Sequence, residues 1–212
     1  MISKTLNILK KMLLILIGLI IVALGVRMYL RSGLGLDAFS VFYQGVSKVI
    51  HVTLGRALQI CLLVLILAAF IIDRKVLGIG TIMHALLLGV FVDLLSIPLP
   101  SPHNVFAASG YLAVGVLLEG IGMGIYISAG LGVGAVDAFM LILYKRIKKN
   151  LKWARICVDC ILAVIGFFLG GSLGVGTVAG VICTGPIIEF TLRLCKSSVI
   201  KGNKGDKNVN LG

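Results

Sequence analysis

The chain has 212 residues, of which 59% are hydrophobic and only 13% are charged. A soluble domain carries about 25% charged residues, so this composition excludes an ordinary soluble protein and indicates a polytopic α-helical membrane protein. A net charge of +12 on a soluble protein would suggest nucleic-acid binding. Here the Lys and Arg residues lie between hydrophobic segments and in the tails, as in cytoplasmic loops, so we expect no nucleic-acid partner.

Hydrophobic segments follow one another along the chain, and each is close to the roughly 20 residues that a transmembrane helix needs. They are residues 12–30, 56–72, 76–96, 105–128, 153–169 and 175–194. Shorter amphipathic segments lie between them, at residues 37–50 and 136–147. We therefore expect an all-α membrane helix bundle.

The hydrophobic segments fall into two membrane regions, residues 12–96 and 105–194, which a Pro-rich linker at residues 97–104 separates. An N-terminal tail at residues 1–11 and a basic tail at residues 195–212 flank them. The basic tails predict that both termini lie in the cytoplasm, with anionic lipid against that face.

A pattern of glycines and charged residues in the first membrane region recurs in the second. Gly18, Gly25, Tyr29, Gly33, Leu34 and Gly35 recur in order as Gly115, Gly122, Tyr126, Gly130, Leu131 and Gly132. Asp37-Ala38-Phe39 recurs as Asp137-Ala138-Phe139, Gly78-x-Gly80-Thr81 as Gly174-x-Gly176-Thr177, and Asp93 as Glu189. Matches at this many Gly and charged positions predict an internal duplication.

Each repeat reads as a long helix, a backbone break, a short helix and two further long helices. The breaks are the Gly-Leu-Gly motifs, with Gly33 and Gly35 in the first repeat and Gly130 and Gly132 in the second. Asp37 and Asp137 follow the breaks, where we expect each to cap the N-terminus of a short helix.

The number of spans depends on whether the short helices cross the membrane. If they do not, each repeat has three spans and the second repeat is inverted; if they do, the chain has eight spans and the repeats run parallel. The distribution of Lys and Arg does not distinguish the two arrangements. Asp137 to Lys145 makes only about 12 Å of helix, which favours six full spans with two short half-inserted helices; eight spans is the alternative.

The motifs Tyr29-Leu30-Arg31-Ser32-Gly33-Leu34-Gly35 and Tyr126-Ile127-Ser128-Ala129-Gly130-Leu131-Gly132, with the Asp137 that follows, resemble the YczE/YyaS/YitT family of bacterial integral membrane proteins. The resemblance extends over about residues 13–194. It implies a multi-pass protein of the bacterial inner (cell) membrane. It implies neither a mechanism nor a catalytic residue.

Most acidic residues lie in or at the ends of hydrophobic segments, where a charge at mid-bilayer costs at least ~2.5–3.5 kcal/mol. Such residues face the bundle interior and are either paired or functional. The candidates for a substrate or ion pathway are Asp37, Asp137, Glu119, Asp93, Glu189 and His84. The alternative is structural: the acids pair with Arg27, Arg56 or Arg155 or cap helices, and His84 is a hydrogen-bonded packing residue.

The remaining motifs carry no recognisable chemistry. Cys157 and Cys160 could share a helix face, but four-coordinate metal binding needs a second pair, and the Gly-x-Gly-Thr motifs lack the Lys of a phosphate-binding loop. The sequence contains no evident pair of nucleophile and base. We therefore expect no enzyme activity, no catalytic residue, no metal and no cofactor.

Two functions fit these features. Inverted repeats, broken helices and duplicated intramembrane acids are typical of a small secondary transporter or permease for a small solute or ion. The alternative is a non-transporting accessory or scaffold subunit, and both functions are compatible with a homo-oligomer or another membrane partner. A transporter needs a polar cavity near Asp37, Glu119 and Asp137, whereas an accessory subunit needs only a packed bundle.

Overall fold

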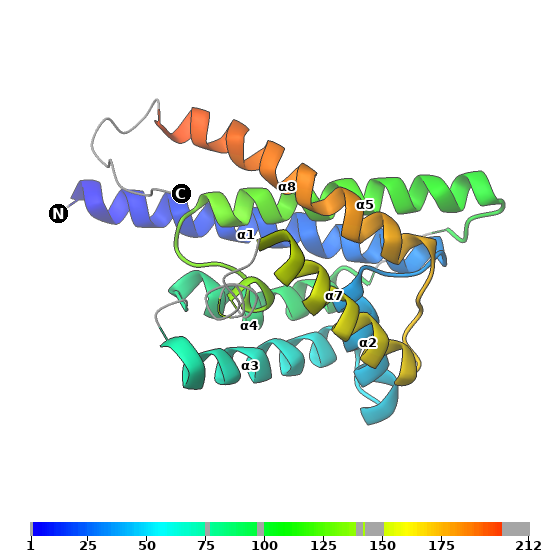
Figure 1. Ribbon diagram of the computed structural model, residues 1–212. Coiled ribbons are helices and arrows are strands. Elements are labelled where there is room, and N and C mark those ends of the chain that lie inside the picture. The colour runs from blue at the N-terminus through cyan, green and yellow to red at the C-terminus, as the bar shows by residue number, and fades with distance from the viewer. Residues whose placement is uncertain (1, 75–76, 97–99, 139–141, 143–150, 201–212) are drawn as a thin grey trace.

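The computed structural model describes residues 2–74, 77–96, 100–138, 142 and 151–200 (Figure 1). The regular structure in these ranges is helical. The helices are α1 (Ile2–Ser32), α2 (Ala38–Ile50), α3 (Leu54–Asp73), α4 (Ile79–Leu94), α5 (Val105–Ser128), α7 (Leu151–Phe168) and α8 (Val175–Ile200). Most of the short segment predicted at residues 136–147 lies outside the described residues.

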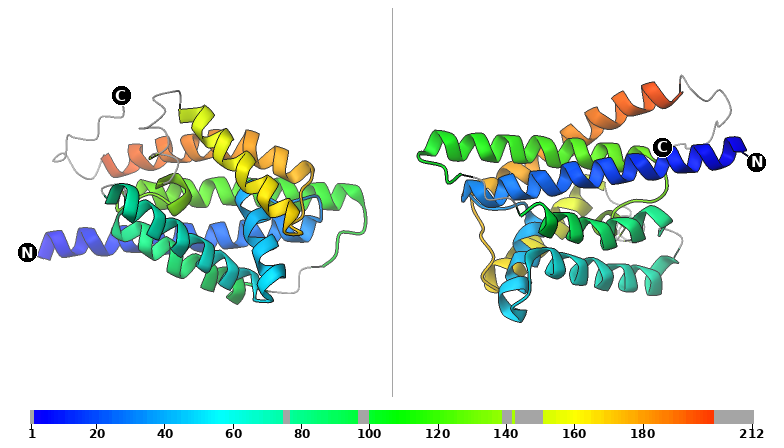
Figure 2. Two further views of the ribbon diagram at one scale, coloured as in Figure 1. Left: turned by 60° about the horizontal axis from the view of Figure 1, so that its bottom comes forward. Right: turned by 180° about the vertical axis from the view of Figure 1, so that it is seen from behind.

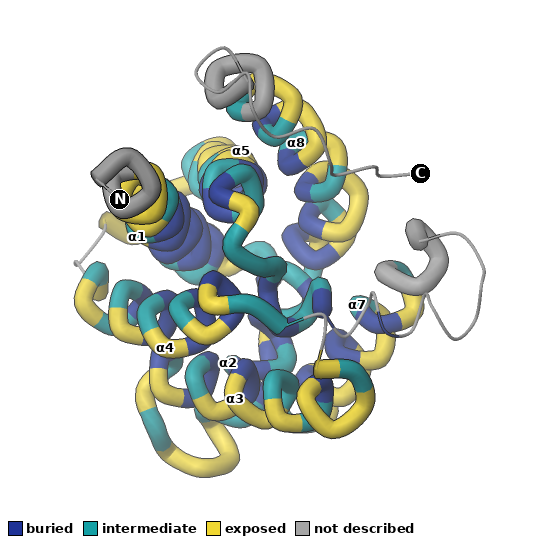
Figure 3. Tube along the Cα trace, turned by 90° about the vertical axis from the view of Figure 1, so that its left-hand side faces the viewer, coloured by how far each residue is buried: buried dark blue, intermediate teal, exposed yellow. Residues whose placement is uncertain are grey.

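Four helices are long and apolar enough to cross a membrane, as far as length and composition decide. They are Asn7–Ser32 within α1, Leu54–Asp73, Val105–Ser128 and Val175–Cys195 within α8. Ile79–Leu94 and Ile156–Phe168 are apolar but shorter. From 33% to 44% of each long span is buried, and many large hydrophobic side chains are exposed. Figure 3 shows exposed residues along the outward sides of the helices. The fold is a polytopic α-helical membrane bundle, as predicted.

The helices α1 and α5 pack along each other more extensively than any other pair of described helices and run antiparallel (Figure 1). A Cβ atom on Gly18 would lie 2.7 Å from the Gly122 carbonyl oxygen, and one on Gly25 would lie 2.9 Å from the Gly115 carbonyl oxygen. These glycines therefore let the two backbones approach more closely than any side chain permits, as is common where membrane helices pack.

The other helices extend from this pair on both sides. Antiparallel α3 and α4 pack on each other, and α4 also packs on α1, whereas α8 packs on α5 (Figure 2). The short α2 lies obliquely between α3 and α7. The start of α1 and the end of α8 lie at one end of the bundle, and the connection into α5 lies at the other.

Three cations at the end of the bundle opposite the start of α1 bind either the end of another helix or the linker. Arg27 donates hydrogen bonds to the Val92 carbonyl oxygen and the Ser96 hydroxyl at the end of α4. Lys48 donates to the carbonyl oxygen of Gly170, 2.6 Å away and just beyond α7. Arg31 donates to the carbonyl oxygen of Pro100 and to the hydroxyl of Ser101. Helix C-termini carry partial negative charge and free carbonyls, so the helix ends that Arg27 and Lys48 contact stabilise a cation.

Candidate functional site

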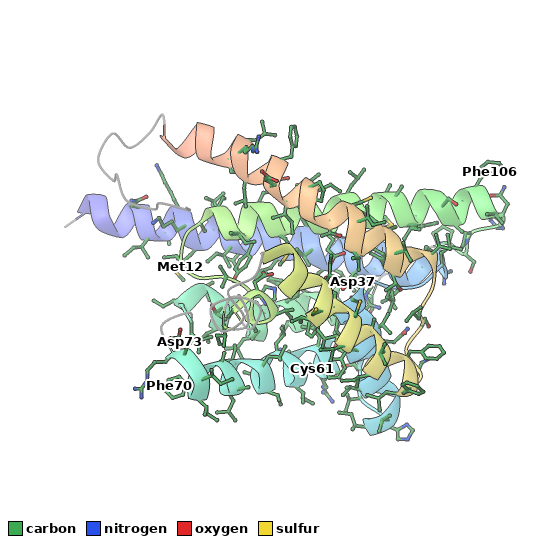
Figure 4. The ribbon with its side chains drawn as sticks, viewed as in Figure 1. Met12, Asp37, Cys61, Phe70, Asp73 and Phe106 are labelled. Atoms are coloured by element: carbon green, nitrogen blue, oxygen red, sulfur yellow. The ribbon has the colours of Figure 1, made fainter. Side chains whose placement is uncertain are left out.

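The first backbone break positions Asp37 at the start of α2. Gly33 and Gly35 adopt left-handed φ angles of 66° and 100°, which glycine reaches without a Cβ penalty. The chain thereby turns back after α1, and the Asp37 side chain accepts a hydrogen bond from the Ser40 amide nitrogen, 3.1 Å away. The predicted N-cap at Asp37 is confirmed, and in Figure 4 this residue lies among the helices, away from the outer ends of the molecule.

The second break differs from the prediction at Asp137. The Ala138 amide donates to the Gly134 carbonyl oxygen, and the described helical turn begins at Ala135, so the cap position is Gly134. Three more residues separate the break from its aspartate here than in the first repeat, and they form the start of the helix. Asp137 therefore lies in the first turn rather than at the cap, where its charge still favours the helix dipole.

Each break is held by the Gly-x-Gly-Thr helix of the other half. The Gly80 amide at the start of α4 donates to the Leu131 carbonyl oxygen, and the Gly176 amide at the start of α8 donates to the Leu34 carbonyl oxygen, both at 2.8 Å. The hydroxyl of Thr81 adds a bond to the Val133 carbonyl oxygen at 2.7 Å. These bonds satisfy backbone groups that a break inside a bilayer leaves exposed.

A cavity of about 80 Å³ lies between the breaks and the long helices. Four of the candidate residues line it: Asp37, His84, Glu119 and Asp137. Ser40 and Tyr43 of α2 also line it, and their hydroxyl oxygens are 2.7 Å apart. The cavity thus collects three carboxylates, an imidazole and two hydroxyls from both halves of the chain.

The His84 side chain is buried, with an exposed fraction of 5%. Its ring packs on the Tyr126 ring with 5.1 Å between centroids. Within the described residues its Nδ1 atom has no hydrogen-bond partner. A buried ring nitrogen without a partner is costly, so the interpretation of His84 as a hydrogen-bonded packing residue does not account for this atom.

A second, smaller cavity of about 30 Å³ adjoins the first. Asp37, Phe39 and Glu119 line both cavities. The second cavity adds Asp159 of α7 together with Gly180 and Thr184 of α8. The two shared carboxylates therefore stand between the two spaces.

Two candidates lie elsewhere. The Asp93 carboxylate accepts hydrogen bonds from the Gly55 amide at 2.9 Å and from the Thr53 hydroxyl at 2.5 Å, which ties α4 to the start of α3. Glu189 pairs with Arg193 of its own helix at 2.6 Å, and both side chains are largely exposed. Neither residue lines the cavities, although the pattern places the two acids at matching positions.

Comparisons with known proteins agree with the predicted resemblance. Residues 9–193 match a family described as "Family of unknown function (DUF6198)". The chain belongs to this family. It is 30% identical to the uncharacterized membrane protein YczE of Bacillus subtilis over 176 residues, 82% of each chain. It is 24% identical to the uncharacterized protein YyaS of Bacillus subtilis over 192 residues, 89% of this chain and 95% of YyaS.

A third relative is an uncharacterized protein of Haemophilus influenzae, 26% identical over 187 residues, which are 87% of this chain and 84% of the relative. No solved structure matches the chain. These relatives include a membrane protein, and none of their names states an activity.

Sequence reasoning did not single out Ser40, Tyr43, Asp159 and Thr184 as site residues. Helical spacing could have found two of them, because Ser40 lies three residues beyond Asp37 and Tyr43 three residues beyond Ser40, and residues three apart are neighbours on a helix. Asp159 and Thr184 carry no comparable signal. They come close to Asp37 only because α7 and α8 pack around α2 and α5. No local pattern in the sequence indicates this packing.

The described residues contain no group of three or more His, Cys, Asp and Glu side chains arranged to hold a metal ion. Cys157 and Cys160 are exposed free thiols. The polar cavities are therefore the arrangement with the clearest chemistry. They can hold water and a small charged species next to carboxylates.

Proposed function

We propose that this protein is a small secondary transporter or permease for a small solute or ion, and not an enzyme. The observation that carries the proposal is the cavity that Asp37, Glu119 and Asp137 line together with His84. Carboxylates inside a membrane bundle are expensive and usually mark a substrate or ion pathway. An accessory subunit needs a packed core but has no need of this polar space.

The contacts between the two halves support an inverted duplication. Under the sequence correspondence, Gly18 matches Gly115 and Gly25 matches Gly122. Exchanging the two halves therefore turns the contact of Gly18 with Gly122 into the contact of Gly115 with Gly25, and both contacts are present. The same exchange turns the Gly80–Leu131 hydrogen bond into the Gly176–Leu34 hydrogen bond, and both are also present. Reciprocal contacts between antiparallel partners are what a two-fold axis in the membrane plane produces. Secondary transporters bind substrate at such an interface between repeats.

We further propose that the protein lies in the bacterial cell membrane with both termini in the cytoplasm, beside anionic lipid. This orientation leaves Arg27, Arg31, Lys48 and Arg56 on the outer side, against the usual preference for cations inside. The bonds of the first three to helix-end and linker oxygens give each of them a structural reason to be there. Three of these four exceptions to the charge rule are thus tied to the fold.

The orientation can be tested at His103, an exposed residue in the connection into α5. A cysteine at this position leaves the Arg31–Ser101 bond intact, in a variant from which the native cysteines have been removed. We expect an impermeant thiol reagent to label it in intact cells, and a tag on the N-terminus to be protected until lysis. Labelling of His103→Cys only after lysis contradicts the six-span topology.

Transport can be tested with purified protein in liposomes. A panel of small solutes and inorganic ions is screened by the current that each evokes on a solid-supported membrane and by tracer uptake, with and without a pH gradient. We expect uptake of at least one species above empty liposomes, and its loss in Glu119→Gln. The matched control is Glu189→Gln, because Glu189 is an exposed carboxylate away from the cavities. Folded protein that moves none of the species favours the accessory role.

A further inference from the structure

Each of the two cavities is lined by an uncharged polar side chain whose N or O atom has no hydrogen-bond partner among the described residues. His84 of α4 lines the larger cavity, and Thr184 of α8 lines the smaller one. We propose that the cavities bind a small polar molecule with N–H or O–H groups, and that the His84 Nδ1 atom and the Thr184 hydroxyl are its hydrogen-bonding contacts. The proposal rests on the transport function above and names the class of its substrate.

The burial of these two atoms makes a missing partner costly. His84 and Thr184 are each only 5% exposed, and within the described part of the chain neither the Nδ1 atom nor the hydroxyl oxygen makes a hydrogen bond. A buried polar atom has lost its hydrogen bonds to bulk water, so it needs an ordered water or a ligand to restore them. Both side chains line a cavity, where such a molecule can reach them.

A buried tyrosine lies beside each of these contacts, at matching positions in the two halves. The Tyr126 ring packs on His84 with 5.1 Å between centroids. The Tyr29 hydroxyl oxygen would lie 3.0 Å from a Cβ on Gly180, one turn before Thr184. The Tyr29 and Thr184 hydroxyls are neighbours, yet in the described ranges neither they nor the Tyr126 hydroxyl makes a hydrogen bond of normal geometry. The two halves therefore repeat one arrangement, in which a buried tyrosine lies beside the polar side chain of a cavity wall.

The chemistry of the two contacts indicates the class of the ligand. The carboxylates that line the cavities all have interactions of their own within the protein, so their charge does not define the ligand. A neutral imidazole offers one N–H donor and one nitrogen acceptor, and a hydroxyl both donates and accepts. These groups suit the N–H or O–H groups of a polar molecule, whereas hard metal cations prefer a shell of oxygen ligands.

The size of the cavities limits the ligand to a few heavy atoms. Pockets for organic ligands commonly measure about 300–1,000 Å³, whereas these cavities measure about 80 and 30 Å³. Water has a share of about 30 Å³ in the liquid, so the larger cavity has room for roughly two or three water-sized groups and the smaller for about one. Ammonia, methylamine and formamide are in this range and carry N–H groups, whereas a sugar is too large.

Nitrogen-15 NMR of His84 tests binding independently of transport. The chain has three histidines, and His51 and His103 are exposed, so the double variant His51→Asn, His103→Gln leaves one labelled imidazole in the full-length protein. Ammonium chloride, methylammonium chloride, formamide or urea is added to this protein in lipid bilayers, with NaCl and sucrose as controls. We expect at least one of the four to shift the His84 nitrogen signals in a saturable way, and neither control to do so.

Substitutions at Thr184 test the second contact without disturbing the fold. Thr184→Val replaces the hydroxyl by a methyl group of similar size, and this hydroxyl has no hydrogen-bond partner in the described chain. Uptake of the active species into liposomes, measured below saturation, should fall about two- to tenfold, as the loss of one hydrogen bond predicts. The midpoint of thermal unfolding should not fall. Thr184→Ser keeps the hydroxyl and should match the unmodified protein in uptake.

His84→Leu and His84→Asn form a matched pair in the larger cavity. Leucine fills a similar volume with no polar atom, whereas asparagine places a hydrogen-bonding atom near the position of Nδ1. His84→Leu should lower uptake of the same species about two- to tenfold, and His84→Asn should restore part of it. Equal loss in both variants, with normal folding, would show that the polar atom is not a contact of the ligand.

The outcomes distinguish this proposal from the transport function itself. If liposomes take up a species that leaves the His84 signals unmoved, and Thr184→Val takes it up at the full rate, the proposed contacts are wrong and transport stands. Uptake of alkali ions alone overturns the substrate class. If none of the four molecules shifts the signals, the cavities hold water alone and the proposal fails. Saturable binding to folded protein that moves no species supports the site and overturns the transport function.

Discussion

The helices α4 and α8 occupy matching places in the two halves, yet they present different chemistry to the centre of the bundle. Both begin at a Gly-x-Gly-Thr motif that binds the opposite backbone break. At matching positions further along, α4 carries His84 and Leu88 where α8 carries Gly180 and Thr184, and each pair lines its own cavity. The comparison teaches that the motifs common to both halves set the backbone frame, while single side chains make the two cavities chemically unlike.

The neighbours of these helices differ as well. The helix α3 packs along α4, whereas α7 packs mainly on α2 and touches α8 little. Asp93 fastens α4 to the start of α3, while the matching Glu189 pairs within α8. Asp159 of α7 lines the smaller cavity with Asp37, Glu119 and Thr184. Among the described residues, α7 and α8 are therefore joined less tightly than α3 and α4, so we expect the motion that opens a pathway to occur there.

The largest expected effect tests whether the two backbone breaks have the same structural role in both halves of the chain. Cβ atoms on Gly35 and Gly132 would lie 2.5 Å from the Gly174 amide nitrogen and 2.9 Å from the Thr81 hydroxyl oxygen. Their φ angles of 100° and 135° are also left-handed. Gly35→Ala and Gly132→Ala should each lower the free energy of unfolding by about 3 kcal/mol or more, measured by thermal unfolding in detergent.

The control is the other glycine of each break. Gly33 and Gly130 have φ angles of 66° and 65°, but no neighbouring atom lies within 4 Å of an added Cβ. Alanine there meets only the left-handed strain of about 1–2 kcal/mol, and asparagine should do better. Equal destabilisation by Gly35→Ala and Gly33→Ala would show that close approach between the halves is unimportant.

An intermediate effect sharpens the contrast between the two matching acids. Asp93→Ala removes bonds from the Gly55 amide and the Thr53 hydroxyl, and hydrogen bonds to charged groups contribute about 1.5–3 kcal/mol. Glu189→Ala removes an exposed pair within one helix, which is worth about 0.3–0.5 kcal/mol. Chemical unfolding of the two variants side by side should reproduce this order. The reverse order would mean that Glu189 has a partner in the membrane that the isolated chain lacks.

Much of the fold could be predicted from the spacing of hydrophobic segments and glycines, because a bilayer fixes helix length and close packing requires small residues. The pattern predicted Asp37 as a cap correctly and Asp137 wrongly. Aligning the two aspartates hid the three extra residues after Gly132, which begin the helix early. The meeting of Asp37, Glu119 and Asp159 depends on the packing of distant helices, and sequence spacing carries no information about it.

The smallest effect separates capping from charge at the two aspartates. Asparagine caps a helix about as well as aspartate, whereas alanine in place of a cap loses about 1 kcal/mol. Because the Asp37 carboxylate accepts from the Ser40 amide, Asp37→Ala should be less stable than Asp37→Asn by that amount. Asp137 lies beyond the Gly134 cap, so its two variants should differ by only a few tenths of a kcal/mol. Both substitutions remove the negative charge, so the difference in stability between the Ala and Asn variants at each position reports capping alone. Transport is then measured on the same proteins, with the species that the liposome screen finds. Asp37→Asn should fold normally and still lose transport, because the proposed pathway needs the carboxylate and the cap does not. Full transport in Asp37→Asn would make Asp37 a cap alone and leave Glu119 as the one carboxylate shared by the two cavities with a role in transport.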